Sequence, residues 1–179
     1  MKQIKINKQI SLFQIQLSDA PEIFNTIDTQ RDYLGKWLPF VANTKEQKNT
    51  EAFIKSVIDT PAEIREFVFV IRYQNDFAGI IGFRDTDRLN WKTEIGYWLS
   101  EDFQGKGIII NSVKEMIRFA FNELKMSRLQ VRCAVSNEKS KKIPRKLGFK
   151  FEGIERAGEL LSNGEYTDLE VYSLLSTDV

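Results

Sequence analysis

The chain has 179 residues, 42% of them hydrophobic, which is enough for one domain with a sizeable core. Its 26 basic and 25 acidic residues give a formal charge of +1, which argues against a nucleic-acid-binding protein that relies on general basicity. Histidine is absent and Cys133 is the only cysteine, so His-based nucleophilic triads, His-ligated metal sites and intrachain disulfides are excluded.

The N-terminal residues form no apolar segment of the kind that targets a chain for secretion. No later run approaches the roughly 20 apolar residues that a membrane span needs. We therefore expect a cytoplasmic protein that contacts no membrane and no nucleic acid and binds no metal.

The first third of the chain predicts one strand and two helices. Alternating apolar residues predict the strand over residues 10–16. Start signals around Pro21 predict a helix that runs to about residue 33. The stretch 44–47 has the form of a capping box, which predicts a second helix that ends at Ile58.

The middle of the chain predicts antiparallel strands. Residues 67–73 and 77–83 are rich in β-branched and aromatic side chains, and the polar turn 74–76 between them indicates a hairpin. Residues 91–99 follow as another strand and end in the glycine-containing loop 104–107.

A long helix after this loop is indicated by an apolar stripe at helical spacing. The stripe consists of Ile109, Val113, Met116, Ile117, Ala120, Phe121 and Leu124. The helix N-terminus would present free N–H groups, and glycines would let the backbone approach an anion such as a phosphate group.

The last third predicts a strand over residues 128–135, a short helix that ends near Gly148, and closing strands over 149–157 and 166–175. Pro144 falls inside the short helix if that helix begins at residue 138, and it would then remove the hydrogen bond to the carbonyl of Ser140. We therefore expect this helix to start late or to be kinked. The order of elements is mixed α/β.

Several motifs together resemble the GNAT family of acyl-CoA-dependent N-acyltransferases. The motifs are Trp37–Phe40, the Glu-Ile-Gly-Tyr-Trp run of residues 94–98, the loop 104–107 with Gln104 and Gly107 as in a Q/R-x-x-G-x-G/A motif, 137–140 and 146–149. The resemblance covers essentially the whole chain and is greatest to the RimJ/RimL group, which acetylates protein N-termini, notably of ribosomal proteins.

The resemblance implies a single GNAT domain over residues 1–179. The implied fold is α/β, with a mixed, mostly antiparallel sheet of about six to seven strands, splayed in the middle and flanked by about four helices. The group is also dimeric, which implies a homodimer.

The resemblance implies acetyl-CoA as the cosubstrate. Its pyrophosphate would be held by backbone amides of the loop and helix start, namely Gln104, Gly105, Lys106, Gly107, Ile108 and Ile109. The pantetheine arm would lie where the strand near residues 97–99 splays from the strand at 128–135. There an N–H of Trp98 or Leu99 would polarise the thioester carbonyl. Asn137 and Ser140 would lie beside the pantetheine and the sulfur.

Two features leave alternatives open at the cosubstrate site. Ile109 stands where the family motif has Gly or Ala, and it would crowd the phosphates unless its side chain points into the core. Five of the eight residues 139–146 are basic, including Lys142. They form either a solvated helix face or contacts to the ribose phosphate of CoA.

Without histidine, the base that accepts the amine proton must be a carboxylate or solvent. Glu94, on the strand that leads to the loop, is one candidate. Glu159 resembles in position the base of RimL-like enzymes, and Ser140 resembles their general acid. Each of these side chains also has a plain structural interpretation, as a surface glutamate or a helix-start serine. Three tyrosines that otherwise suit the core remain possible acids: Tyr97, Tyr166 and Tyr172.

A protein α-amine has a pKa of about 7.7–8.0, against about 10.4 for lysine, so a weak carboxylate base favours an N-terminal α-amine as acceptor. Arg31, Trp37 and Phe40 would border the acceptor groove. The first hypothesis is acetyl transfer to the N-terminal α-amine of a protein. The alternatives are an acetyltransferase for a small amine, such as a polyamine, amino acid or antibiotic, and a non-catalytic CoA-binding protein.

Overall fold

One eight-stranded sheet organises the computed structural model, which describes residues 2–61 and 66–179. The strand order is β1-β2-β3-β4-β5-β6-β8-β7, and the pairing is antiparallel except between β5 and β6. This confirms the predicted mixed, mostly antiparallel sheet. The eighth strand, β1 (Gln3–Lys5), was not predicted, because three residues are too short to show an alternating pattern.

The first half of the sheet consists of four further strands: β2 (Ile10–Gln14), β3 (Val68–Tyr73), β4 (Asp76–Asp87) and β5 (Lys92–Leu99). The β3–β4 hairpin turns at Gln74 and Asn75, both with positive φ, as the polar turn predicts. Residues 67–73 and 77–83 thus form the expected hairpin, and β4 continues four residues beyond the predicted end.

Four helices fill the connection between β2 and β3: α1 (Ala20–Thr29), α2 (Arg31–Gly35), α3 (Phe40–Asn43) and α4 (Gln47–Ile58). The single helix expected up to residue 33 is therefore two helices. The capping box of α4 uses Glu46 and Asn49 rather than residues 44–47. The Thr44 hydroxyl instead donates to the Phe40 carbonyl at the end of α3, so it is not available as the cap of α4.

The second half begins after the single-turn helix η2 (Glu101–Phe103). It comprises α5 (Ile108–Asn122), β6 (Arg128–Ala134), α6 (Glu138–Lys146), β7 (Lys150–Leu160) and β8 (Tyr166–Leu175). With the short η1 (Leu17–Asp19), the described residues thus form six α-helices and two short 3₁₀ helices, more than the four expected. The two α-helices beyond the expected four are the short α2 and α3, between β2 and β3.

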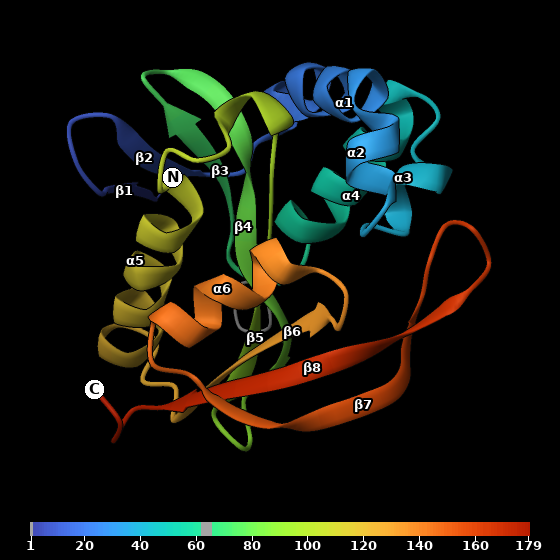
Figure 1. Cartoon of the computed structure of the whole chain (residues 1–179). Helices are drawn as coiled ribbons and strands as arrows, with labels where there is room; N and C mark the ends of the chain where they lie inside the picture. The colour runs from blue at the N-terminus through green and yellow to red at the C-terminus, as the bar shows by residue number, and fades with distance from the viewer. Residues whose placement is uncertain (1, 62–65) are drawn as a thin grey trace.

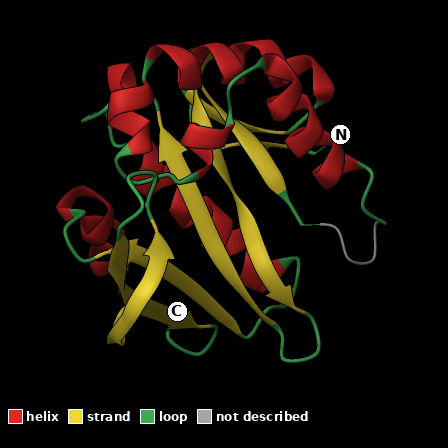
Figure 2. Ribbon diagram, turned by 90° about the vertical axis from the view of Figure 1, so that its right-hand side faces the viewer, coloured by secondary structure: helices red, strands yellow, loops and turns green. Residues whose placement is uncertain are grey.

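Two hydrophobic cores lie on opposite faces of the sheet. In β3, Phe69 and Ile71 pack into the core beneath α5, whereas Val68 and Val70 pack into the core beneath α1 and α4. Figure 1 accordingly shows α5 on one side of the central strands and α1 to α4 on the other. Figure 2 shows the strands as one twisted sheet.

The sheet opens between its two central strands. β5 and β6 pair over only three residues, Lys92–Glu94 with Arg128–Gln130, although β5 continues to Leu99 and β6 to Ala134. Beyond Glu94 the two strands diverge, and β6 pairs on its other edge with β8. The expected splay in the middle of the sheet is therefore confirmed.

Candidate active site

A glycine loop carries the chain from β5 into α5. Gly105 and Gly107 have φ values of 75° and 71°, in the left-handed region that favours glycine, and Gly107 is the N-cap of α5. The helix closes its first hydrogen bond from the Asn111 N–H to the Gly107 carbonyl, so the amides of the three preceding residues have no partner within the helix. These N–H groups and the helix dipole form a site for an anion.

The side chains at the start of α5 point away from this anion site. Ile108 is 1% exposed and belongs to the core, and Ile109 is partly buried against the same core. The apolar stripe therefore predicted the buried face of α5 well, although Ile108 and Phe119 also belong to it. Ile109 packs against the core, as its position in the apolar stripe predicts.

Polar side chains of α6 and the loop meet beside the helix N-terminus. Lys139 on α6 donates to the Gln104 side-chain carbonyl at 2.6 Å. Lys106 folds back so that its ammonium group donates to the Asp102 carbonyl and lies over the Phe103 ring. Lys142, one turn along α6 from Lys139, is exposed. The loop therefore has cations close to its amides.

The backbone of β5 presents N–H groups to the gap at alternate residues. The Ser100 N–H bonds to the Ala78 carbonyl of β4 at 2.8 Å. Alternation in an antiparallel pair then directs the Trp98 N–H toward β4 and the N–H groups of Tyr97 and Leu99 toward the gap. Between the two amides considered from the sequence, this geometry favours Leu99.

Three side chains with transferable protons converge at the gap: Tyr97 from β5, Cys133 from β6 and Ser140 from α6. The Tyr97 hydroxyl oxygen lies 3.2 Å from the Ser140 Oγ and 3.3 Å from the Ser140 carbonyl oxygen. Burial raises the pKa of Tyr97, and it raises the pKa of the Cys133 thiol to about 11, although a hydrogen bond from Ser140 opposes the latter rise. All three groups are therefore protonated at neutral pH.

Contacts of α6 at two places hold Ser140 in this position, one at the helix N-cap and one at the next residue, Lys141. The Asn137 side chain is the N-cap and accepts the Ser140 N–H at 3.1 Å. The Lys141 ammonium group, which is buried, donates to the Val135 carbonyl at 2.6 Å and to Glu170 at 3.1 Å. Lys141 is thus a structural contact of α6 rather than part of an exposed basic face.

Of the two alternatives expected for α6, a late start or a kink, the late start is wrong. The helix begins at Glu138, directly after its Asn137 cap, and Pro144 lies inside it. The helix tolerates Pro144 because the Ser140 carbonyl, which loses its usual helical donor, accepts a hydrogen bond from Tyr97.

The two candidate base residues have different surroundings. Glu94 is 3% exposed, and both of its oxygens are engaged: Oε1 by Arg84, and Oε2 by Arg132 at 2.6 Å and by Gln130 at 3.4 Å. It lies at the last paired residue before β5 and β6 diverge. Its carboxylate therefore links β4, β5 and β6 at the base of the gap.

Glu159 near the end of β7 is partly buried, and within the described residues its carboxylate accepts no hydrogen bond. Burial raises its pKa, while the positive charges of Arg84 and Arg132 oppose this rise. A carboxylate with a raised pKa and no fixed partner is suited to accept a proton. Of the two candidates, the geometry favours Glu159.

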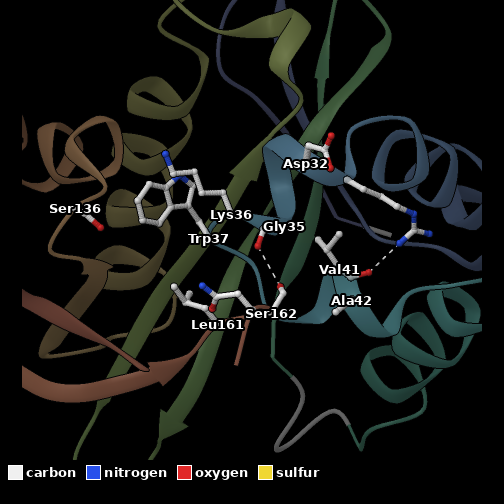
Figure 3. Close-up of a pocket in the computed structure, with 11 residues that line it drawn as sticks. Asp32, Gly35, Lys36, Trp37, Val41, Ala42, Ser136, Leu161 and Ser162 are labelled. Carbon is white, nitrogen blue, oxygen red and sulfur yellow. Dashed lines mark hydrogen bonds between the residues drawn. The ribbon is translucent and has the colours of Figure 1, made fainter. Parts of the chain in front are cut away.

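A cavity of about 590 Å³ opens between α2–α3 and the β7–β8 hairpin (Figure 3). Its lining includes Arg31 and Trp37, two of the three residues expected to border the acceptor groove, together with Ser136, Leu161 and Ser162. The Ser162 hydroxyl donates to the Gly35 carbonyl at 3.1 Å and joins the two walls (Figure 3).

Two of the residues expected at the acceptor groove differ from that expectation in position or in the contacts they make. Phe40 does not line the cavity and is 41% exposed on α3. Arg31 lines the cavity but also donates to the carbonyls of Val41 and Thr44, so it supports the α2–α3 wall.

Sequence reasoning missed the Arg84–Glu94–Arg132 network and the contact between Tyr97 and Ser140, because their partners lie far apart in the chain. Pro144 was a signal for the Tyr97–Ser140 contact, since it indicated an unbonded Ser140 carbonyl, but the donor could not be identified.

Across residues 2–61 and 66–179, no group of three or more acidic or Cys side chains is placed to hold a metal ion. No helix in this part of the chain is long and apolar enough to cross a membrane.

Comparison with protein families gives a match over residues 9–150 to the acetyltransferase (GNAT) domain. YdaF of Bacillus subtilis (strain 168), named provisionally as a ribosomal N-acetyltransferase, is 35% identical over 97% of this chain and 95% of its own. The ribosomal-protein-serine acetyltransferase of Escherichia coli (strain K12) is 25% identical over 95% of this chain and 94% of its own. The spermidine N(1)-acetyltransferase of the same strain is 31% identical, but over only 55% of this chain and 52% of its own.

Two solved structures with bound ligands are similar over nearly the whole chain. RimL, described as a ribosomal L7/L12 alpha-N-protein acetyltransferase in complex with coenzyme A, has a TM-score of 0.93 and 25% identity, and the match covers 99% of this chain and all of RimL. The microcin C7 self-immunity acetyltransferase MccE, in complex with acetyl-CoA and AMP, has a TM-score of 0.89 and 29% identity, with 96% and 95% covered.

Proposed function

This chain belongs to the GNAT family of acetyltransferases, and from that premise we propose that it transfers the acetyl group of acetyl-CoA to the N-terminal α-amine of a ribosomal protein. The observation that carries the proposal is the similarity, over at least 95% of the chain, to relatives named for ribosomal-protein acetylation. Membership of this enzyme family also sets aside the alternative of a non-catalytic CoA-binding protein.

The residues present fit acetyl-CoA as cosubstrate. The amides from Gln104 to Ile109 suit its pyrophosphate, because two glycines expose them and the helix dipole favours an anion there. The pantetheine arm suits the gap where β5 and β6 no longer pair. Asn137 caps α6 just beyond the end of β6. Lys139 contacts the loop at Gln104, and Lys142 is exposed one turn further along α6, so both would attract the ribose phosphate.

The protein contributes three groups to acetyl transfer. Glu159 accepts the proton of the attacking amine, directly or through water, and Glu94 holds the strands that carry the site. The Leu99 N–H donates to the carbonyl oxygen that becomes negative during attack. Ser140 donates its hydroxyl proton toward the departing CoA sulfur, and the proton that Glu159 took from the amine returns through solvent to restore Ser140. An α-amine suits this site, because roughly a tenth or more of it is already neutral at pH 7.

The test is acetylation of a panel of acceptors, with release of the CoA thiol as the readout. Ribosomal-protein N-terminal peptides should be acetylated, and the same peptides with a blocked α-amine should not. Mass spectrometry should place the acetyl group on the first residue. Acetylation of spermidine or lysine side chains without any acetylation of α-amines would refute this assignment of the acceptor.

A small amine is the second candidate, because spermidine acetyltransferases also match the chain, one at 31% identity over 55% of it and another at 23% identity over 96% of it. The cavity argues against a polyamine. Its charged lining residues are Arg31, Lys36 and Asp32, two cations and one carboxylate, so a polycation would meet net repulsion there. The acceptor panel distinguishes the two candidates directly.

We also propose a cytoplasmic homodimer. β7 is the edge strand of the sheet opposite β1, and its 11 residues include large exposed apolar side chains such as Phe151 and Ile154, each 56% exposed. An exposed apolar edge strand of this length favours association with a second copy. Light scattering coupled to size-exclusion chromatography should give a mass near twice 20.8 kDa, and a single-chain mass would contradict the dimer.

A further inference from the structure

Pro144 changes the hydrogen bonding of one residue in the proposed active site. It occupies the seventh position of the nine-residue helix α6. A proline has no N–H to donate to the carbonyl four residues earlier, and its ring pushes that carbonyl outward from the helix. The carbonyl concerned belongs to Ser140, whose hydroxyl lies beside Tyr97 and Cys133.

The hydroxyl of Tyr97 occupies the place of the missing helical donor. It reaches across from β5 and lies 3.3 Å from the Ser140 carbonyl oxygen and 3.2 Å from the Ser140 Oγ. Figure 1 shows α6 passing over this part of the sheet. Both distances are longer than those of an ordinary O–H···O hydrogen bond, as expected when one O–H is shared between two acceptors.

Burial keeps Tyr97 protonated, so its hydroxyl acts as a donor. The Ser140 carbonyl can only accept, whereas the contact between the two hydroxyls allows either one to donate. Where Tyr97 donates to both oxygens of Ser140, the proton of the Ser140 hydroxyl points elsewhere. The remaining direction is toward Cys133 on β6, which forms the other wall of the gap.

We propose that Pro144 and Tyr97 act together as positioning residues: the proline frees the Ser140 carbonyl, and the Tyr97 hydroxyl bridges both Ser140 oxygens so that the serine proton points into the gap. This inference rests on the proposed acetyl transfer, in which Ser140 donates to the departing sulfur. Neither positioning residue needs to touch either substrate.

Stability and turnover should respond in different directions to changes at these residues. Pro144→Ala restores an N–H that bonds the Ser140 carbonyl, so the melting temperature should rise. The restored bond competes with Tyr97, so kcat should fall about tenfold while the KM for acetyl-CoA changes less than about twofold. Tyr97→Phe should lower kcat similarly but should lower the melting temperature, because it leaves the Ser140 carbonyl unpaired.

The double variant gives the sharpest test. Pro144→Ala added to Tyr97→Phe should restore the melting temperature, since the new N–H satisfies the Ser140 carbonyl, but it should not restore kcat. The two effects on kcat should therefore be strongly non-additive. If kcat recovers together with stability, the bridge has only a structural role and the proposal is wrong. Unchanged turnover in Pro144→Ala would overturn it equally.

Tyr172→Phe is the matched control. Its hydroxyl accepts a hydrogen bond from Arg145 of α6 at 2.8 Å and donates one to Glu170 of β8, and no hydrogen bond between it and Ser140 is found in the described structure. It should lower stability, and its effects on both stability and kcat should be additive with those of Pro144→Ala.

A spectroscopic measurement separates this inference from the proposed function. In protein labelled with ¹³Cζ-tyrosine, the Tyr97 signal, assigned by its loss in Tyr97→Phe, should shift in Pro144→Ala, whereas the Tyr172 signal should not. An unshifted Tyr97 signal would show that proline does not control the bridge. If the wild type acetylates no amine, the proposed function fails, and the carbon signal still decides whether the bridge exists.

Discussion

Glu94 and Glu159 lie near the same two arginines, yet their surroundings give them different tasks. Glu94 is enclosed, and its two oxygens are divided between Arg84 and Arg132. Glu159 interacts electrostatically with both arginines but makes no hydrogen bond to either in the described structure, and burial raises its pKa. The residue with fixed partners supports the sheet, and the residue without them is the better proton acceptor.

Glu159→Gln should lower kcat/KM by about 10²-fold or more, because removal of a general base typically costs 10²–10⁴. In the wild type, activity should rise with pH through the raised pKa of Glu159, above the ordinary value of about 4.3, and the variant should lack this rise. Glu155→Gln, on the same strand and bonded to Arg132, is the matched control and should stay within about twofold. A pH profile with the same lower limb in Glu159→Gln would exclude it as the base.

The same variant should not lose stability at pH 8. A carboxyl with a raised pKa in the folded state contributes stability below its unfolded pKa, and this contribution is lost as the pH rises through the folded value. At pH 8 the charged, partly buried Glu159 is therefore a cost that glutamine removes. The melting temperature of Glu159→Gln should equal or exceed that of the wild type. A marked decrease would indicate a structural role instead.

Glu94→Gln should act mainly on stability. It removes the carboxylate that is bonded to both Arg84 and Arg132. We expect a loss of about 2–3 kcal/mol in the free energy of unfolding, less than the ~3–5 kcal/mol of a fully buried pair because Arg84 can reach water. Urea unfolding followed by tryptophan fluorescence measures it. Glu152→Gln, which breaks a more exposed pair with Arg128, is the control and should cost less.

At the scale of elements, the loop before α5 depends on backbone conformation more than on side chains. Gly107→Ala places a side chain at φ 71°, which should cost about 1–2 kcal/mol or rotate the amides away from the phosphates. The KM for acetyl-CoA should therefore rise about tenfold, which corresponds to about 1.4 kcal/mol. Gly164→Ala imposes similar strain at φ 83° in the β7–β8 turn and should leave this KM unchanged. Equal KM values for the two variants would contradict a phosphate site at Gly107.

Local patterns predicted the elements whose sequence signal is repeated several times. Helix α5 follows its apolar stripe, and the β3–β4 hairpin follows its polar turn. Short elements such as β1 and α3 contain too few residues for any periodicity. The cap of α4 shifted because Thr44 found a partner at the end of α3, a tertiary detail that no local pattern contains.

In the candidate site, too, the locally encoded features were predictable from the sequence and the long-range contacts were not. The loop at Gly105 and Gly107 was predictable, because glycine spacing before an apolar stripe is a local signal. The engagement of Glu94 was not, because Arg132 lies 38 residues away and reaches it only when β5 and β6 pair. The Tyr97–Ser140 contact spans 43 residues and depends on how α6 crosses the sheet.

At the scale of the whole molecule, the sheet is weakly joined at its centre. β5 and β6 share three residue pairs, whereas β6 and β8 share seven. Below the splay the Arg84–Glu94–Arg132 network connects the halves, and above it α6 contacts β5 through Ser140 and Tyr97. A ligand in the gap would contact both halves, so its binding should stabilise the molecule as a unit.

Acetyl-CoA should therefore raise the stability of the protein and protect both walls of the gap. A ligand that binds only the folded state adds about 2.7 kcal/mol at 100 times its Kd. Hydrogen exchange should slow at Tyr97 and Leu99, at Arg132 and Ala134 and at the amides that begin α5, because alternation along β5 and β6 directs these strand N–H groups to the gap and the α5 amides lie at the loop. Adenosine alone, which lacks the pyrophosphate and the pantetheine arm, should leave all three segments unchanged. Protection at α5 without any along β5 and β6 would place the arm outside the gap and contradict the proposed binding mode.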